Sequence, residues 1–386
     1  MDFSEWYTSS TEVLQDLKDW WRIQLVSVGD GVVLLSGMTR GEGGHGELER
    51  RSVVYLLLTV DSHGTIAQEA VTAPPLPESE QKRYPNEDYD SPRDRYNTTL
   101  SAGGGRVYAV HYTLGYHNST AGWGTSSWAH RTLVYSLDMA SLLWHEVEQV
   151  VTVIPPATDR DIEKQIVTPT PRIKPICTCV DGTLMLIGGK RSQFRSSGYA
   201  TGRDRHAPES GETLESSVEA LDPETERWAV LVPRMEELDS LKLSGGRACV
   251  AHRDTAYVRG SGDIWLLLRQ PSPGSILSSA GVFSLDRPIG FLPRSLVSVG
   301  KYILMLPDTD YADRAKNYGD EGVYTPMMWD PISDDTHLCK GLPGMGCEYR
   351  TGCMLTATTL LVVSIRGCTH TFRVLTLAPE MVWPVV

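Results

Sequence analysis

The chain lacks the features that mark membrane-spanning, secreted and nucleic-acid-binding proteins. Its apolar runs are strand-sized, such as Thr359 to Ile365, and none approaches the ~20 residues of a membrane helix. The net charge of −12 argues against a general nucleic-acid binder. The first residues have neither the basic start nor the apolar core of a secretory signal, and an odd count of 7 cysteines fits a reducing compartment. We therefore expect a protein of the cytoplasm or nucleus that binds neither membranes nor nucleic acid.

Catalytic and cofactor motifs are equally scarce. The chain has no Gly-x-Ser-x-Gly elbow, no phosphate-binding P-loop and no His-Glu-x-x-His pair. Gly41 to Gly46 spells a dinucleotide fingerprint, but such a fingerprint must open a helix, whereas residues 51–60 read as a strand. Cys177 and Cys179 have no second Cys or His pair at zinc-finger spacing, so the cysteines read as buried structural thiols, with Cys339 nearest a surface turn. The sequence predicts no catalytic residue, no cofactor and no metal site.

Turn residues and short apolar strands are abundant, with 35 Gly, 23 Pro and 41% apolar residues. The stretch from Thr183 to Met235 shows the pattern most clearly. An apolar strand ends in Gly188 and Gly189, a second strand ends at Asp222, and a turn then leads to Trp228. These marks resemble a kelch repeat, one blade of a β-propeller. A blade cannot bury both of its faces alone, so the resemblance implies further blades beside it.

Five degenerate copies of the same strand pattern surround this repeat. Each combines a short turn, an apolar strand, another strand before it and a third strand at some distance after it. Outer strands are expected at Trp144, Trp228 and Trp383. We predict one all-β domain over residues 23–386, a kelch-type β-propeller of six four-stranded blades. The blades are expected near residues 23–73, 98–154, 176–235, 247–293, 295–345 and 350–386.

Residues 1–22 stand apart from the repeats. Ser9 to Glu12 resembles a capping box, and one helical stripe would hold Val13, Leu14, Leu17, Trp20 and Trp21. We expect a short amphipathic N-terminal helix that packs on the propeller, or alternatively docks a partner. An F-box or BTB module, which precedes kelch repeats in ubiquitin-ligase receptors, would need more residues, so ligase membership is not implied.

The residues in excess of a minimal repeat are expected to lie at one end of the ring. In an antiparallel blade the first and third turns emerge at one end, and the middle loop and the links between blades emerge at the other. The turns at the first end are short hairpins. The long segments all belong to the second end: residues 39–51, 113–131, 190–215 and 307–322 within blades, and 74–97 and 155–175 between blades. Insertions on one face of a repeat protein indicate a binding face.

The chemistry of these insertions differs from blade to blade. The loop of the third blade is basic, that of the second is aromatic, and that of the fifth is acidic. Aromatic and arginine side chains on adaptable loops are typical of interface hot spots, although charge runs can also be solvated surface. The candidate partner-binding residues are Lys190, Arg191, Arg195, Arg203, Arg205, Tyr116, Trp123, Trp128, Asp310 and Asp313.

Two functions remain open at this point. The first is a non-enzymatic protein–protein interaction module or adaptor, acting on a protein partner or as a subunit of a larger complex. The second is a propeller-based enzyme or small-molecule-binding protein acting on a sugar-like substrate in the central pocket, because the resembled family includes sugar oxidases and sugar-acid epimerases. Copper oxidases need tyrosine and histidine ligands, for which Tyr108, His111 and Tyr112 are the available residues. The acidic, motif-poor sequence favours the first function.

Overall fold

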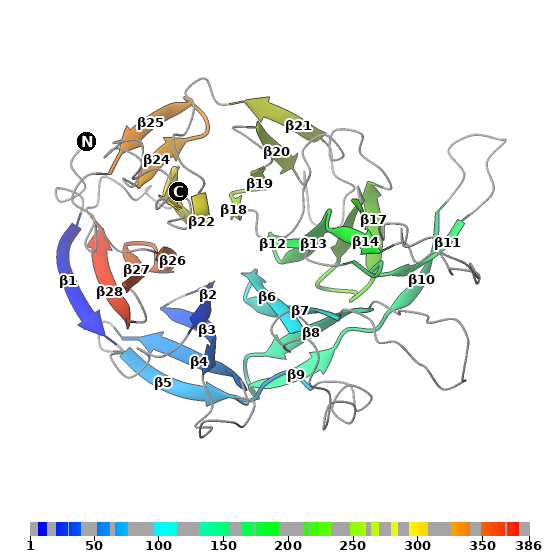
Figure 1. The fold of residues 1–386 in the computed structure, drawn as a ribbon, viewed down its shortest axis with the longest axis horizontal. Helices are drawn as coiled ribbons and strands as arrows, with labels where there is room; N and C mark the ends of the chain where they lie inside the picture. The colour runs from blue at the N-terminus through cyan, green and yellow to red at the C-terminus, as the bar shows by residue number, and fades with distance from the viewer. Residues whose placement is uncertain are drawn as a thin grey trace, which may run out of the picture.

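The structure, a computed structural model, is a ring of six antiparallel sheets (Figure 1). This confirms the predicted all-β, six-bladed propeller, and neither a helix nor a helical membrane span occurs in the ranges described. The described residues are 7–13, 21–29, 31–39, 52–61, 66–75, 96–113, 131–154, 164–172, 175–192, 212–214, 217–232, 248–259, 264–269, 279–284, 293–307, 326–339, 349–366 and 369–377.

Each blade has four strands, which follow one another from the ring axis outward. The first holds β2 (Trp21–Gly29), β3 (Val32–Thr39), β4 (Ser52–Val60) and β5 (Ile66–Val71). The second holds β6 (Tyr96–Gly103), β7 (Arg106–Thr113), β8 (Arg131–Asp138) and β9 (Leu143–Glu146). The third holds β12 (Ile176–Val180), β13 (Thr183–Ile187), β16 (Val218–Leu221) and β17 (Trp228–Val232).

The other three blades follow the same order. The fourth holds β18 (Cys249–His252), β19 (Thr255–Arg259), β20 (Ile264–Arg269) and β21 (Ser279–Ser284). The fifth holds β22 (Pro293–Val299), β23 (Tyr302–Pro307), β24 (Met327–Asp330) and β25 (Asp335–Leu338). The sixth holds β26 (Tyr349–Thr356), β27 (Thr359–Arg366), β28 (Thr369–Leu377) and, from the opposite end of the chain, β1 (Tyr7–Val13).

The N-terminal strand closes the ring. β1 pairs antiparallel with β28, with Tyr7 opposite Leu377 and Val13 opposite Phe372 (Figure 1). The expected N-terminal helix is therefore wrong for residues 7–13, which belong to the sixth blade. Thr and Val tolerate a pleated strand well, and the outer edge of β28 offers unpaired backbone groups that a helix could not use. Trp383, expected on the outer strand, lies outside the described residues, and β1 occupies that position.

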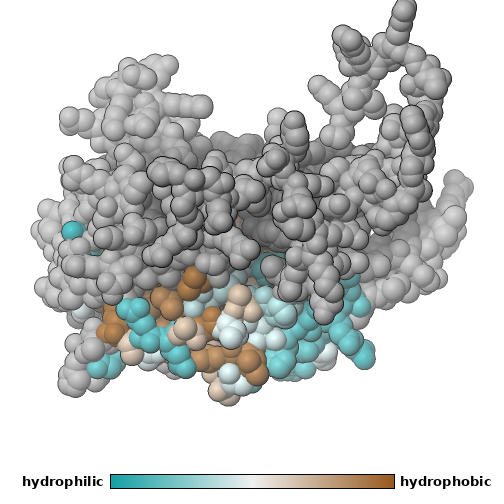
Figure 2. All heavy atoms as spheres, turned by 60° about the horizontal axis from the view of Figure 1, so that its bottom comes forward, coloured by the Kyte–Doolittle hydropathy of each residue, from teal (hydrophilic) through white to brown (hydrophobic). Residues whose placement is uncertain are grey.

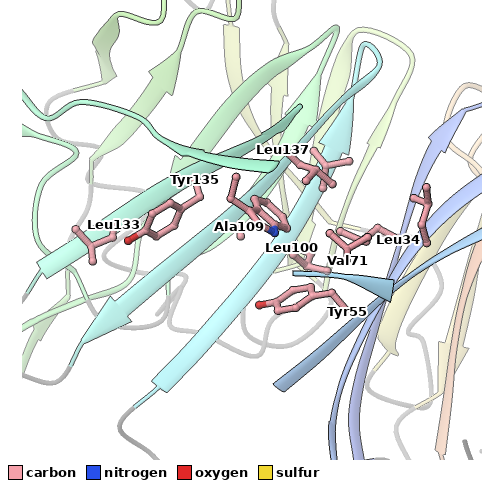
Figure 3. Close-up of a cluster of buried hydrophobic side chains, with 11 residues drawn as sticks. Leu34, Tyr55, Val71, Leu100, Ala109, Leu133, Tyr135 and Leu137 are labelled. Atoms are coloured by element: carbon pink, nitrogen blue, oxygen red, sulfur yellow. The ribbon is translucent and has the colours of Figure 1, made fainter. Parts of the chain in front are cut away.

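The core lies between blades rather than within them. Successive residues of a strand point to opposite faces, so each blade packs on both of its neighbours. In Figure 3, Tyr55 and Val71 of the first blade face Leu133 and Tyr135 of the second, and all four side chains are buried. The indole of Trp144, on β9, completes this interface as expected by lying edge-on to Tyr55.

Burial is greatest around the second strand of each blade and is lower at the outer rim. Every residue of β12 and β13 is buried, which explains their nearly continuous apolar sequence, because neighbouring blades cover both faces. By contrast, Ala67 to Ala70 on the outer strand β5 are exposed. In Figure 2, which brings the lower rim of Figure 1 forward, the described residues form a small brown group flanked by teal residues.

Two hairpins supplement the blades. β10 (Val150–Ile154) pairs with β11 (Lys164–Thr168) in the link between the second and third blades, and this hairpin lies against β17 at the outside of the ring (Figure 1). β14 (Lys190–Ser192) pairs with β15 (Glu212–Leu214) inside the insertion of the third blade. Both therefore belong to the end of the ring that carries the long connections.

Candidate functional site

The strand order assigns each connection to one end of the ring. At one end, the first and second strands of the blades join through residues 30–31, 104–105, 181–182, 253–254, 300–301 and 357–358. At the other end, the second and third strands join through residues 40–51, 114–130, 188–217, 260–263, 308–326 and 367–368. The four long connections within blades thus leave and return at the same end as the links between blades, whereas the fourth and sixth blades have short connections there.

Few of the candidate partner-binding residues fall in the described part of the chain. Lys190 and Arg191 open β14, and they pair across the hairpin with Leu214 and Thr213. The others, which lie outside the described residues and stay predictions, are Arg195, Arg203, Arg205, Tyr116, Trp123, Trp128, Asp310 and Asp313.

The glycine pair marks the place where the third blade's insertion begins. Gly188 and Gly189 have φ angles of 58° and 104°, in the left-handed region that side chains with a Cβ rarely adopt. The ladder between β13 and β16 ends with Ile187 opposite Val218, and the Gly188 N–H still donates to the Ser217 carbonyl at 3.2 Å. The pair, predicted only to end the strand as a repeat feature, allows a change of chain direction at the root of the insertion.

A buried ion pair at this root was missed by sequence reasoning. Arg172 Nη2 lies 2.8 Å from Glu219 Oε1, and both side chains are fully buried. The available signal was Glu219 itself, a charged residue inside the otherwise apolar run of β16. A buried charge is costly unless it is paired, so such a residue predicts a cationic partner, although its position in the sequence does not say which one.

The opposite end of the ring carries a repeated turn. The carboxylates of Asp138, Asp222 and Asp330 accept hydrogen bonds from the backbone N–H two residues later, at 3.0, 2.8 and 3.0 Å. The pKa of each carboxyl lies below its ordinary value, mainly through the Ser141 hydroxyl at Asp138 and the Glu224 N–H at Asp222. At Asp330, burial raises the pKa, and hydrogen bonds from the Ile332 N–H and Lys301 outweigh that effect. In all three turns the fourth residue after the aspartate has a positive φ, and these residues are Leu142, Glu226 and Asp334.

Asp222 lies at the turn before the outer strand of the third blade, and Trp228 lies on that strand. The Thr225 hydroxyl donates to the Asp222 carboxylate at 2.9 Å, which closes the turn. Trp228 begins β17 and is buried between the second and third blades. The same turn occurs at Asp138 and Asp330, and Trp144 follows Asp138 at the same spacing as Trp228 follows Asp222.

A cavity of about 570 Å³ lies on the ring axis, lined by the innermost strand of every blade. Its described lining consists of apolar side chains, thiols, hydroxyls and the amide of Gln24, with no charged residue among them. The amide pairs with the edge of β6 by accepting from the Leu100 N–H at 2.9 Å and donating to the Thr98 carbonyl. Much of this hydrogen-bonding capacity is therefore used to join neighbouring blades.

Each adjacent pair of blades is joined near the axis by at least one polar contact. The contacts, in ring order from the first blade, join Gln24 to Leu100, Ser101 to Cys179, Cys249 to the Cys177 carbonyl, His252 to Ser298, Thr351 to Ser295, and the Gly31 N–H to the Leu355 carbonyl. This ring of contacts holds the inner strands together without using charge.

The side chains considered for copper do not converge. Along β7, Tyr108 packs toward the third blade, whereas Val107 and Ala109 pack toward the first. Because side chains alternate, Tyr112 shares the side of Tyr108 and His111 points the other way. His111 Nδ1 lies 2.6 Å from the Thr98 hydroxyl, and burial lowers its pKa to about 4. The described residues contain no cluster of three metal-ligating side chains.

The five cysteines in the described ranges have structural rather than reactive surroundings. Cys177 and Cys179 share one face of β12, as predicted, and pack between the second and third blades. Burial raises the pKa of Cys179, Cys249 and Cys339 to about 12, which disfavours the nucleophilic thiolate. The placement of Cys339 near a surface turn is wrong, because its side chain is only 2% exposed.

Comparisons with known proteins extend only to the fold. No protein-family model matches the chain, and no curated protein sequence matches it. The solved structure of YjhT is 12% identical, with a TM-score of 0.49 over 93% of this chain and 96% of that one. The Hadza microbial sialidase Hz136 is 9% identical, with a TM-score of 0.50 over 94% of this chain and 66% of that one. At this identity the likeness to the sialidase shows a shared propeller fold and nothing about substrate.

Proposed function

We propose that this chain is a kelch-type propeller that acts as a non-enzymatic interaction module in the cytoplasm or nucleus. The observation that carries the proposal is the strand order. It gathers the long connections of four blades, together with the links between blades, at one end of the ring. Long insertions on one face of a rigid repeat scaffold are typical of partner binding. The opposite end, which joins the first and second strands of every blade through two residues, supplies the rigid support.

The kelch assignment is supported by the recurrence of one local structure. The turns at Asp138, Asp222 and Asp330 share the same side-chain cap and the same positive φ four residues later. Trp144 and Trp228 then begin or occupy the outer strand at the same spacing in two of these blades. Independent evolution of the same cap, backbone and aromatic anchor in separate blades is less economical than descent from one repeat.

The rival function is binding or catalysis in the axial cavity, whose volume suits a small molecule. General acid–base catalysis needs a titratable side chain close to the reacting group, and the described lining offers thiols with raised pKa values. We therefore favour partner binding. Metal analysis of the purified protein separates the two functions, because stoichiometric copper or iron would contradict the non-enzymatic assignment.

The direct test is quantitative affinity purification with mass spectrometry on four proteins: wild type, two variants of the proposed face, and a control. One variant reverses the charges of Lys190, Arg191, Arg195, Arg203 and Arg205 to Glu, and the other reverses Lys190 and Arg191 alone. The control reverses Arg227 and Arg253, which are exposed at the opposite end, and it matches the two-residue variant in charge change.

We expect a partner that the control retains and that both variants of the proposed face lose or weaken. Surface substitutions usually cost less than about 0.5 kcal/mol, so the melting temperatures should stay close to that of wild type. A sharp fall in melting temperature in the five-residue variant would mean that these cations are structural. Equal capture by all four proteins would contradict the basic insertion as a binding site, and no partner in any sample would favour the axial cavity.

A further inference from the structure

The root of the basic insertion contains backbone groups that have left the sheet. The ladder between β13 and β16 ends at Ile187 and Val218, yet Gly188 and Ser217 remain buried. A buried carbonyl needs a hydrogen-bond donor, and beyond the last ladder pair the opposite strand no longer supplies a regular one. The hairpin of β14 and β15 begins immediately beyond this point.

The guanidinium of Arg172 supplies a donor to the Gly188 carbonyl and a second donor to the Ser217 carbonyl, which also accepts from the Gly188 N–H. Its Nη1 donates to the carbonyls of Gly188 at 3.1 Å and Ser217 at 3.3 Å, and its Nη2 donates to the Ser217 hydroxyl at 3.0 Å. One planar, permanently charged group thus bridges the two chain segments on either side of the root. An apolar side chain could fill this volume but could not donate to these carbonyls.

Glu219 neutralises that charge and ties it to the preceding link. Its carboxylate accepts from Arg172 Nη2 at 2.8 Å, from the Thr170 N–H at 2.8 Å and from the Thr170 hydroxyl. The Thr132 hydroxyl, on β8 of the second blade, in turn accepts from the Arg172 N–H at 2.9 Å. One buried hydrogen-bond network therefore joins three parts of the chain: the second blade, the link carrying the β10–β11 hairpin, and the root of the β14–β15 hairpin.

We propose that the Arg172–Glu219 pair sets the position of the β14–β15 hairpin, so that Arg172 is a positioning residue for the partner-binding end of the ring. The consequence for partner binding rests on the proposed function, whereas the effect on the hairpin does not. The pair connects the blade to the insertion, because Glu219 lies on β16 and Arg172 donates to the backbone at the root. Lys190 and Arg191 lie directly beyond Gly189, so their placement depends on this root.

Hydrogen exchange of the amides in residues 188–192 and 212–214 tests the proposal, with the β12–β13 ladder as internal reference. Arg172→Lys keeps the positive charge beside Glu219 but lacks the planar fork of donors. The double variant Arg172→Met/Glu219→Leu removes both charges and retains an apolar filling. We expect exchange at the root and hairpin to rise about tenfold or more in both variants, because hydrogen bonds from a charged donor are lost. The reference ladder should keep its protection.

A merely structural pair predicts a different result. In that case the apolar double variant, once folded, restores the protection of the hairpin together with that of the blade, and this outcome would overturn the proposal. If the double variant does not fold, Arg172→Lys decides in the same way, since unchanged hairpin exchange in it would also overturn the proposal. Partner capture is measured separately on the same proteins. Faster hairpin exchange without any partner would retain the positioning role and reject the proposed function.

Discussion

The third and fourth blades have the same strand order but are stabilised by different chemistry. The third blade encloses the charged pair of Arg172 and Glu219, whose side chains are fully buried. The fourth blade has its ion pair at the surface, where Arg269 and Asp254 lie 2.7 Å apart with side chains 62% and 39% exposed. Its face toward the fifth blade is aromatic, and Trp265 on β20 is completely buried there.

The aromatic interior of the fourth blade continues into the fifth. The rings of Trp265 and Trp329 lie 5.2 Å apart, and Tyr257 meets Trp329 edge-on at 5.4 Å. The corresponding strands of the third blade contribute aliphatic side chains such as Met185 and Ile187. A propeller therefore requires that each interface be filled and each buried polar group be paired, but it does not require one set of residues. This explains why the repeat motif can be recognised in the sequence of the third blade but not in that of the fourth.

Truncation of the tryptophans should have the largest effect. Trp265→Ala and Trp228→Ala should each lower the free energy of unfolding by about 3–5 kcal/mol, because a large cavity remains in a packed interface. Trp265→Ala should cost more, since that ring is fully buried and packs at a tilt against Trp329. Urea unfolding measures both, with Leu143→Ala at an exposed site as control. A cost below about 1 kcal/mol for Trp265→Ala would refute the packing described for the fourth blade.

The two ion pairs should differ almost as much. Arg172→Met on its own leaves the Glu219 carboxylate buried without its cation, and we expect a loss of about 3–5 kcal/mol. Arg269→Met breaks a pair that solvent already screens, so its effect should be about 0–1 kcal/mol. Thermal unfolding at low and high salt measures both losses. A strong salt dependence for Arg172→Met, or equal losses for the two variants, would contradict the contrast between the blades.

Acid should weaken the fourth blade through His252. Burial and Arg253 lower the pKa of His252 to about 4, while Asp330 opposes the shift. The ordinary value is 6.5, so the unfolded chain binds this proton more readily than the native protein. The contribution to stability is complete above pH 6.5 and is lost as the pH falls toward 4, by up to about 3 kcal/mol. His252→Gln, which can still pair with Ser298, should flatten this part of the profile of unfolding free energy against pH.

The third blade has no histidine at the corresponding position, where Val180 precedes the turn. The pH dependence that remains in His252→Gln should come in part from His111, whose pKa burial also lowers to about 4. If the profile of unfolding free energy against pH were unchanged in His252→Gln, the pKa of His252 would not be lowered in the native protein.

The smallest effect is expected at the repeated turn. Asp222→Ala removes the acceptor for the Glu224 N–H and the Thr225 hydroxyl, and should cost about 1 kcal/mol. Because hydrogen bonding lowers the pKa of this carboxyl, its contribution is present above pH 3.8 and is lost as the pH falls through the native value. Chemical denaturation at neutral pH measures the loss. Asp222→Asn should retain part of the stabilisation that Asp222→Ala removes. A loss as large as that of Trp228→Ala would assign the turn a wider role than closing one hairpin.

Much of the ring could be predicted because its signals are local. Alternating apolar runs, tight turns and the Asp222–Trp228 spacing all lie within single blades, and they placed the outer strands at Trp144 and Trp228 but not that of the sixth blade. The sixth was mispredicted because Ser9 to Glu12 is compatible with both a helix cap and a strand. Its conformation depends on the open edge of β28, at the other end of the chain. Arg172 was missed for a similar reason, since its partners at Gly188, Ser217 and Glu219 follow in a later part of the sequence.

The sequence by itself determined that this protein builds β-blades and that their long connections belong to one end, because side-chain alternation and turn chemistry act between neighbours in the chain. Only the tertiary structure decided which strand completes the ring and which charges are buried together. Both depend on groups that lie far apart in the sequence and gain their free energy only when the blades meet: the unpaired edge of β28 selects β1, and the buried carbonyls beside Glu219 select Arg172.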